Sequence, residues 1–170
     1  MRKTRGPLRR IINETYDVSE LEQIDAPLNE GEMIAQWTSH ASCLVSICML
    51  TYNHAPWLRN TLSGILNQKT DFGFEILIHD DASTDGSQDI IREFQARYPR
   101  IIKPIFQQEN KWSKGINPSI EYNYPRANAE FVAWCEGDDM WIDKNKLALQ
   151  VAGLRSNPSI NLSFHQAIQI

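Results

Sequence analysis

Two pairs of adjacent aspartates constrain this sequence most strongly, because each pair follows a short apolar run. Asp80-Asp81 ends a run rich in isoleucine, and Asp138-Asp139 comes just after a run that contains Phe, Val and Trp. Such runs are typical of buried strands, and in open α/β sheets ligands bind just beyond the carboxyl ends of the strands. We therefore expect both pairs at one rim. Crowded carboxylates repel unless a cation or hydrogen-bond donors offset their charge, so a metal-assisted site is the first hypothesis.

Apolar runs alternate with helical patterns along most of the chain. The expected strands are 44–50, 74–79, 101–106 and 131–136, with a last apolar run at 160–164. The expected helices begin near Pro56, follow the polar stretch 82–87, span about 119–129 around Pro125, and follow Asp143. This order with short loops predicts an α/β fold, a mostly parallel sheet covered by helices on both faces.

The first part of the chain differs from the rest in composition. Residues 1–42 begin basic and then turn acidic, so we interpret them as a peripheral N-terminal extension beside a single domain, 43–170. The basic start could touch an anionic membrane surface as one weak signal. The alternative is a solvated, partly frayed tail.

Composition argues against some classes of function for this chain, such as nucleic-acid binding. With 42% hydrophobic residues and a net charge of −4, the chain can form one core and lacks the basic field of a nucleic-acid-binding protein. Its 3 cysteines are odd in number, and two lie in expected strands, so we interpret them as small buried hydrophobic residues rather than a disulfide framework or a zinc site. This interpretation favours a reducing, cytoplasmic setting. No run has the length of a membrane span, and the start lacks a secretory signal, so we expect a soluble protein.

The two aspartate pairs suit different parts of a ligand. Carboxylates at Asp138-Asp139 suit Mg²⁺ or Mn²⁺ bridged to a diphosphate, with Gly137 allowing close backbone approach and Trp141 as a platform. The alternative is a turn that caps a helix. At Asp81 a carboxylate could accept an N–H of a pyrimidine or of guanine, with Tyr52 stacking on the base; here helix capping and an ordinary strand-end tyrosine are the alternatives.

Three ordered motifs resemble the nucleotide-sugar-binding half of a family 2 glycosyltransferase with the GT-A fold, which is Rossmann-like. They are residues 44–53, 80–87 and 135–141. The resemblance covers roughly residues 43–166. Segments 110–115 and 123–127 are similar to a bacterial branch of the family linked to surface-polysaccharide synthesis.

The resemblance implies a role for each candidate residue. Asp139 would ligate Mg²⁺ or Mn²⁺, and Asp138 would lie by the ribose or the metal. Asp81 would bind the base of a nucleotide-diphospho-sugar, and Tyr52 would stack on that base. The other implied donor-site residues, which shape the loop or contact the diphosphate, are Thr51, Asn53 and Arg126.

The resemblance also implies a reaction, an inverting transfer of a hexose-type sugar to a glycan or lipid-linked acceptor in the cytoplasm or at the inner face of the membrane. Such a transfer needs a general base for the acceptor hydroxyl. Family members carry this base and the acceptor site in a further half, so we expect the base beyond Ile170 and a domain that is truncated or completed by a partner. Three acidic residues in or near loops show no link to that role: Glu109, Glu121 and Asp143.

Other classes fit less well. A non-catalytic nucleotide-sugar-binding or interaction module stays open as the alternative. A phosphoacceptor domain would place its acidic pair after the first strand, where Thr51-Tyr52-Asn53 stands, and no dinucleotide or phosphate-binding glycine loop follows that strand. The 4 histidines lack metal-ligand spacing. Trp134 is expected in the core, while Trp112 remains a candidate sugar-stacking surface.

Overall fold

Parallel strands form a 4-stranded sheet in the order β3-β2-β1-β4. The computed structural model describes residues 26–38, 40–165 and 167, and for 40–42 the backbone alone. The strands are β1 (His40–Thr51), β2 (Phe72–Asp80), β3 (Ile102–Phe106) and β4 (Phe131–Glu136). All three pairings are parallel, so the carboxyl ends of the strands share one rim, as predicted.

Burial follows the position of each strand in the sheet. Every residue of β2 is buried, and Ile47 of β1 with Ile76 and Ile78 of β2 is fully inaccessible to solvent. Runs of Ile, Val and Phe without polar alternation are typical of strands covered on both faces. The sequence therefore identified the two central strands correctly.

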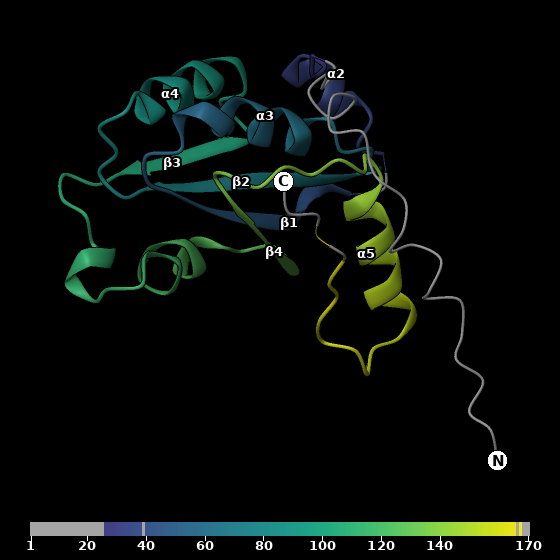
Figure 1. Ribbon diagram of the computed structural model, residues 1–170. Coiled ribbons are helices and arrows are strands. Elements are labelled where there is room, and N and C mark those ends of the chain that lie inside the picture. Colours follow the sequence, from purple (N-terminus) through teal and green to yellow (C-terminus); the bar gives the residue numbers. More distant parts are fainter. Residues whose placement is uncertain (1–25, 39, 166, 168–170) are drawn as a thin grey trace, which may run out of the picture.

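Helices flank the sheet on both sides. They are α2 (Glu30–Ala35), α3 (Ala55–Leu66), α4 (Ser87–Arg97) and α5 (Lys146–Ser156). In Figure 1, α3 and α4 lie over one face, and α5 lies on the other side of the sheet. Pro56 stands in the first turn of α3, where its missing N–H costs nothing, and Leu58, Leu62 and Ile65 form the buried stripe of that helix.

The helix predicted over 119–129 is wrong in kind. A π-helical turn, Ser119–Asn123, is followed by a 3-10 turn, Tyr124–Arg126, and a further 3-10 turn covers Trp112–Lys114. Pro125 lacks the N–H that a continuing α-helix needs. The π-helical turn is nevertheless anchored beneath the sheet, because Asn123 Nδ2 donates to the carbonyl of Met49 at 3.0 Å.

Strand β4 is less buried than the sequence predicted. It lies at the edge of the sheet, and its side chains alternate, with Val132 and Trp134 exposed and Cys135 buried. The prediction that Trp134 belongs to the core is therefore wrong, since its exposed fraction is 55%. The apolar run 160–164 forms no strand, and Phe164 in it is exposed. A hollow of about 670 Å³ lies between β4, α5 and residues 161–165.

All three cysteines are free. Cys48 and Cys135 are buried, as expected for small hydrophobes, and burial raises the pKa of the Cys48 thiol to about 11. Cys43 is exposed, so the same interpretation is wrong for it. Within the described part of the chain, no helix combines the length and the apolar character needed to cross a membrane.

Candidate functional site

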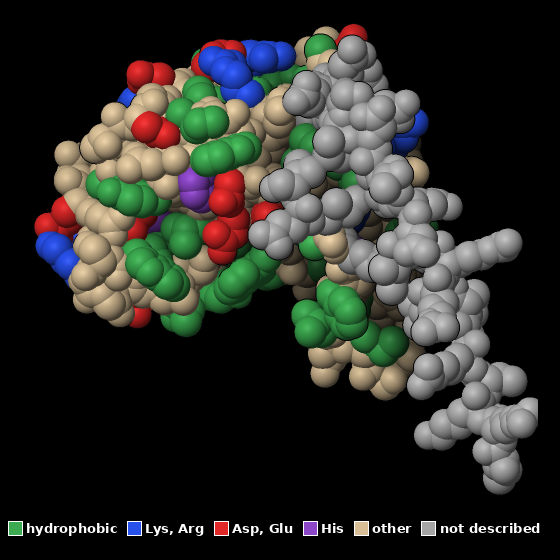
Figure 2. Space-filling view, in the orientation of Figure 1, with side chains coloured by type: hydrophobic (Ala, Val, Ile, Leu, Met, Phe, Trp, Pro, Cys, Tyr) green, Lys and Arg blue, Asp and Glu red, His purple; other side chains and the backbone are tan. Residues whose placement is uncertain are grey.

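The carboxyl ends of β1, β2 and β4 lie next to one another in the sheet. The strand register places Thr51 opposite Asp80 and Leu50 opposite Glu136. Both aspartate pairs therefore follow strands that flank β1, at one rim, as the sequence predicted. Figure 2 shows acidic side chains gathered beside a histidine and several hydrophobic side chains on this side of the molecule.

Two rim loops are held together by hydrogen bonds between their tips. The amide of Asn53 donates to Ser83 Oγ at 2.9 Å, and the amide of Thr84 donates to Asn53 Oδ1 at 2.8 Å. Asn53 and Ala82 both have positive φ, 56° and 67°. Asparagine tolerates that conformation, whereas for alanine it carries a conformational cost that the surrounding bonds must offset.

The polar stretch 82–87 leads into α4, but the predicted side-chain cap is wrong, because the N-cap residue is Gly86 and no side chain caps the helix there. Asp85 Oδ1 accepts from the amide of Ser87 at 3.0 Å, and Asp85 Oδ2 accepts from the amide of Ala55 at 2.9 Å. Asp85 therefore connects the beginnings of α3 and α4. This local chemistry accounts for Asp85 but leaves the preceding pair, Asp80-Asp81, to other partners.

Asp80 and Asp81 are buried and bonded to protein. Asp80 Oδ1 accepts from Gln88 Nε2 at 2.6 Å and from the amide of Ser83 at 3.1 Å. The Asp81 carboxylate accepts from the amides of Lys111 and Trp112, at 2.7 and 3.0 Å. Asp81, with 1% of its surface exposed, thus holds the loop after β3 against the rim. The same contact places Trp112, which is 60% exposed, beside the rim.

A histidine lies beneath Asp81. His79 is fully buried, its Nε2 lies 3.6 Å from Asp81 Oδ1, and its ring packs on Tyr122 with centroids 4.9 Å apart. Burial lowers the pKa of His79, while the charge of Asp81 acts in the opposite direction. We infer that a neutral ring fills this position in the folded protein.

Asp138 and Asp139 have the opposite environment. Both are exposed, and among the described residues no group donates a hydrogen bond to either carboxylate. The nearest basic group is His54, whose Nδ1 lies 3.7 Å from Asp138 Oδ1. Burial raises the pKa of the neighbouring Cys135 thiol. The charges of Asp139, Asp138 and Glu136 raise it further, and the charge of Lys146 opposes them.

The backbone beneath this exposed pair is tightly fixed. The Gly137 amide donates to the carbonyl of Leu50 at 2.9 Å, and Thr61 Oγ1 donates to the carbonyl of Gly137 at 3.0 Å. A Cβ on Gly137 would lie 2.6 Å from Thr51 Oγ1 and 2.8 Å from His54 Nδ1. Only glycine allows this approach, in agreement with the sequence-based expectation.

The remaining predicted residues divide between the rim and the interior. Tyr52 lies at the rim and is 45% exposed, whereas Thr51 is fully buried there. The terminal nitrogens of Arg126 donate to the carbonyls of Lys103 and Ile78, at 2.9 and 2.8 Å, behind the rim. Burial lowers the pKa of the Arg126 guanidinium.

Trp141 is a packing residue, which corrects its expected role as a platform. It is 6% exposed, and the Lys146 ammonium lies 3.9 Å from the centre of its ring. Its backbone packs against α3 so closely that a Cβ on Gly64 would lie 2.7 Å from the Trp141 carbonyl oxygen. His54, which sequence spacing did not single out, lies at the site instead. Its place just after the Thr51-Tyr52-Asn53 motif was the available signal.

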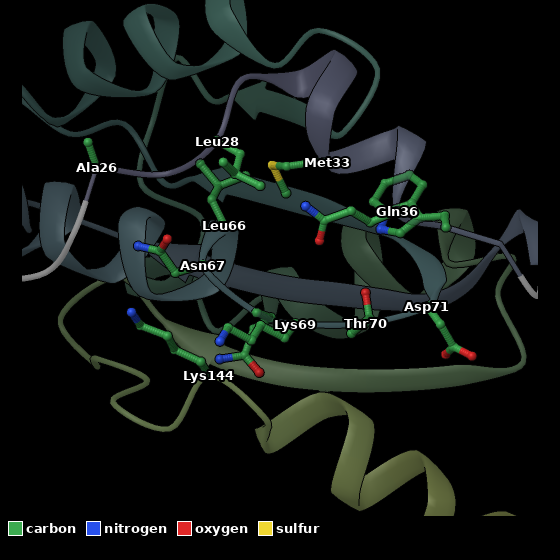
Figure 3. Close-up of a pocket in the computed structure, with 12 residues that line it drawn as sticks. Ala26, Leu28, Met33, Gln36, Leu66, Asn67, Lys69, Thr70, Asp71 and Lys144 are labelled. Atoms are coloured by element: carbon green, nitrogen blue, oxygen red, sulfur yellow. The ribbon is translucent and has the colours of Figure 1, made fainter.

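A second hollow lies away from the rim. Its volume is about 610 Å³, and it is lined by α2, the end of α3 and the loop that enters β2. In Figure 3, Lys69 and Lys144 line it together with Leu28, Met33 and Leu66. These segments lie at the amino ends of the strands, so this hollow is separate from the aspartate rim.

Sequence comparison identifies relatives of the chain. The model of glycosyl transferase family 2 matches residues 46–168. The uncharacterized protein Rv1520 of Mycobacterium tuberculosis is 40% identical over 121 residues, which cover 71% of this chain and 34% of that protein. The chain thus spans about a third of the length of this relative.

Solved structures show the same fold. The mannosyltransferase PcManGT of Pyrobaculum calidifontis, in complex with GDP-Man and Mn²⁺, is 26% identical with a TM-score of 0.59, over 68% of this chain and 33% of that one. Staphylococcus aureus TarS in complex with UDP-GlcNAc is 26% identical with a TM-score of 0.57, over 66% and 31%. Together with the family match and the two aspartate motifs at one rim, these similarities show that the chain belongs to glycosyltransferase family 2.

Proposed function

We propose that this domain binds a nucleotide-diphospho-sugar at the rim of the sheet and presents the sugar for transfer. The observation that carries the proposal is the exposed Asp138-Asp139 pair, which follows the fixed backbone of Gly137 on the same rim as Tyr52 and Asp81. Two relatives of known structure were solved with such donors, GDP-Man and UDP-GlcNAc. In this proposal the free carboxylates of the second pair bind the diphosphate through a cation. The Tyr52 ring and the buried Asp81 carboxylate bind the base.

Asp138 and Asp139 supply some of the ligands that a divalent cation needs, but not a complete set. Carboxylate oxygens are the ligands that Mg²⁺ and Mn²⁺ prefer, and among the described residues no Lys or Arg forms an ion pair with the Asp139 carboxylate. No three His, Cys, Asp or Glu side chains in the described ranges are grouped so that they could hold a metal. We therefore propose that Asp139 holds Mg²⁺ or Mn²⁺ together with diphosphate oxygens, with Asp138 by the ribose or the metal. The bound ion would neutralise charge on the leaving diphosphate.

The base is assigned to Asp81 and Tyr52. A carboxylate has about four acceptor positions, so the two amides that bind Asp81 leave capacity for an N–H of the base. Tyr52 exposes its ring at the same rim. Thr51 and Asn53 shape the loop. A contact between Arg126 and the diphosphate would require the guanidinium to release one of its strand carbonyls.

The reaction proposed for the whole protein is inverting transfer to a glycan or lipid-linked acceptor of a bacterial surface polysaccharide. Its general base is assigned outside the residues described. A cytoplasmic location at the membrane surface, aided by the basic start of the chain, belongs to the same proposal; that start lies outside the described residues.

A thermal-shift experiment tests donor binding. We expect UDP or GDP with Mn²⁺ to raise the melting temperature of the wild type by several degrees, because a ligand that binds only the folded state stabilises it. Asp139→Ala should lose most of the shift, whereas Asp89→Ala, a change at an exposed carboxylate of α4, should keep it. Equal shifts in Asp139→Ala and the wild type would exclude the metal role.

Turnover distinguishes a transferase from a binding module. Incubation of the purified chain with UDP- and GDP-sugars and Mn²⁺ should release nucleoside diphosphate slowly, by hydrolysis of the bound donor. Donor binding without any release would support the alternative, a non-catalytic nucleotide-sugar-binding module.

A further inference from the structure

Two of the buried polar atoms that have no hydrogen-bond partner among the described residues follow each other closely at the end of β1, beside Gly137. Within the described residues, Thr51 Oγ1 and His54 Nδ1 are inaccessible to solvent and unbonded. Both face the same glycine, since a Cβ on Gly137 would lie 2.6 and 2.8 Å from them. Buried polar groups are nearly always satisfied, so an unpaired one at a candidate site needs an explanation.

The His54 ring is held by its own backbone. Its amide donates to Ser87 Oγ at 3.0 Å, and its carbonyl accepts from the amides of Trp57 and Leu58, both at 3.0 Å, at the start of α3. The Trp57 ring also packs against the imidazole in a T-shaped arrangement, with centroids 6.2 Å apart. The imidazole therefore has a fixed position relative to the rim.

The Asp138 carboxylate, in contrast, can adjust. Its side chain is 46% exposed, and it follows Gly137, whose N–H and carbonyl are both bonded. The distance of 3.7 Å from His54 Nδ1 to Asp138 Oδ1 exceeds a hydrogen bond by less than 1 Å. A small rotation of the aspartate would close the gap, while the backbone stays in place.

We propose that His54 is a positioning residue for Asp138, donating a hydrogen bond from Nδ1–H to the carboxylate both before and after the donor binds. A carboxylate only accepts hydrogen bonds, and a neutral imidazole donates through one nitrogen, so the contact requires the Nδ1–H tautomer. His54 then fixes the orientation of Asp138 toward the ribose or the metal. The inference rests on the proposed function and adds a residue to the same site.

The contact is tested first without ligand. Long-range ¹H–¹⁵N NMR spectra of the full chain, recorded at about pH 8 where imidazole is mostly neutral, report the tautomer of each histidine. We expect the Nδ1–H form of His54 to be well populated in the wild type and to give way to Nε2–H in Asp138→Ala. Asp89→Ala should leave it unchanged. The same tautomer in wild type and Asp138→Ala would overturn the proposal.

The second test measures binding. Calorimetric titration with Mg²⁺-UDP and Mg²⁺-GDP should give about tenfold weaker binding in His54→Phe, the effect of losing one hydrogen bond to a charged group. His54→Asn, which restores a donor, should recover most of the affinity, and Asn60→Ala on α3 should match the wild type. Wild-type affinity in His54→Phe, or no recovery in His54→Asn, would contradict the positioning role.

The two tests distinguish a failure of the proposed donor binding from a failure of the positioning role. If the wild type binds neither nucleotide, the proposed donor binding is wrong, while the tautomer comparison still decides whether His54 contacts Asp138. If binding is present but the tautomer does not respond to Asp138→Ala, the donor site stands and His54 has no positioning role.

Discussion

The two aspartate pairs share a dipeptide and a sheet rim but have opposite environments. Asp80 and Asp81 are 0% and 1% exposed and are bonded by side chains and amides of the protein. Asp138 and Asp139 are exposed, and their carboxylates accept no hydrogen bond from the described residues. The first pair organises the rim by holding its loops, and the second pair leaves its oxygens available to a ligand.

The difference comes from the position of each strand. β2 lies inside the sheet, where its carboxyl end meets α4 and the loop after β3, so donors surround the acids. β4 lies at the edge and is followed by a glycine turn that exposes the next two side chains. Removing each pair should therefore have different consequences. Loss of the first pair should impair folding, and with it the base contact proposed for Asp81, whereas loss of the second pair should impair binding alone.

The largest effect is expected for Asp81→Ala. This change leaves the amides of Lys111 and Trp112 without their buried acceptor, and bonds to charged groups contribute about 1.5–3 kcal/mol each. We expect the free energy of unfolding, measured by urea denaturation, to fall by about 3 kcal/mol. Asp138→Ala should change it by less than about 0.5 kcal/mol, as for most exposed positions. Similar losses in the two variants would break the comparison.

A smaller effect is expected for Gly137→Ala. The added Cβ would lie 2.6 Å from Thr51 Oγ1, and overpacking of this kind costs about 1–3 kcal/mol. Gly153→Ala is the matched control, because nothing lies within 4 Å of its Cβ, and alanine in a helix should add roughly 0.5 kcal/mol. Urea denaturation of both variants would show whether the backbone that precedes Asp138 and Asp139 is rigid. A neutral Gly137→Ala would contradict that view.

The smallest expected effect is a dependence of the unfolding free energy on pH, caused by His79. Burial lowers its pKa in the folded protein, with Asp81 and Asp80 opposing this and Arg126 adding to it, whereas an unfolded histidine titrates near about 6.5. The unfolded state therefore binds more protons as the pH falls, and stability declines from about pH 7.5 toward pH 5.

His79→Phe tests the origin of this decline. The substitution keeps a ring beside Tyr122 and removes the titrating group. We expect a flatter dependence of the unfolding free energy on pH in this variant. An identical slope in both proteins would assign the decline to other groups.

Much of the fold could be read from the sequence because the central strands and their helices carry strong patterns. The run ending at His79 has apolar residues on both faces, such as Ile76 and Leu77, and the stripe with Leu58 and Leu62 has a clear helical period. The prediction that Trp134 lies in the core was wrong, because an all-apolar run is typical of a buried strand even where an edge strand exposes alternate residues. Likewise, the partners of Asp81 come from a loop about 30 residues away, and no local pattern reports such contacts.

The central claim is that Asp139 binds a divalent cation together with a nucleoside diphosphate. Calorimetric titration of UDP and GDP, with and without Mn²⁺, into the wild type and Asp139→Asn tests it most directly. We predict binding that requires Mn²⁺ in the wild type and is weakened at least about tenfold in Asp139→Asn, whose side chain keeps the size but loses the charge. Binding of equal strength in both proteins, or binding that ignores Mn²⁺, would contradict the account.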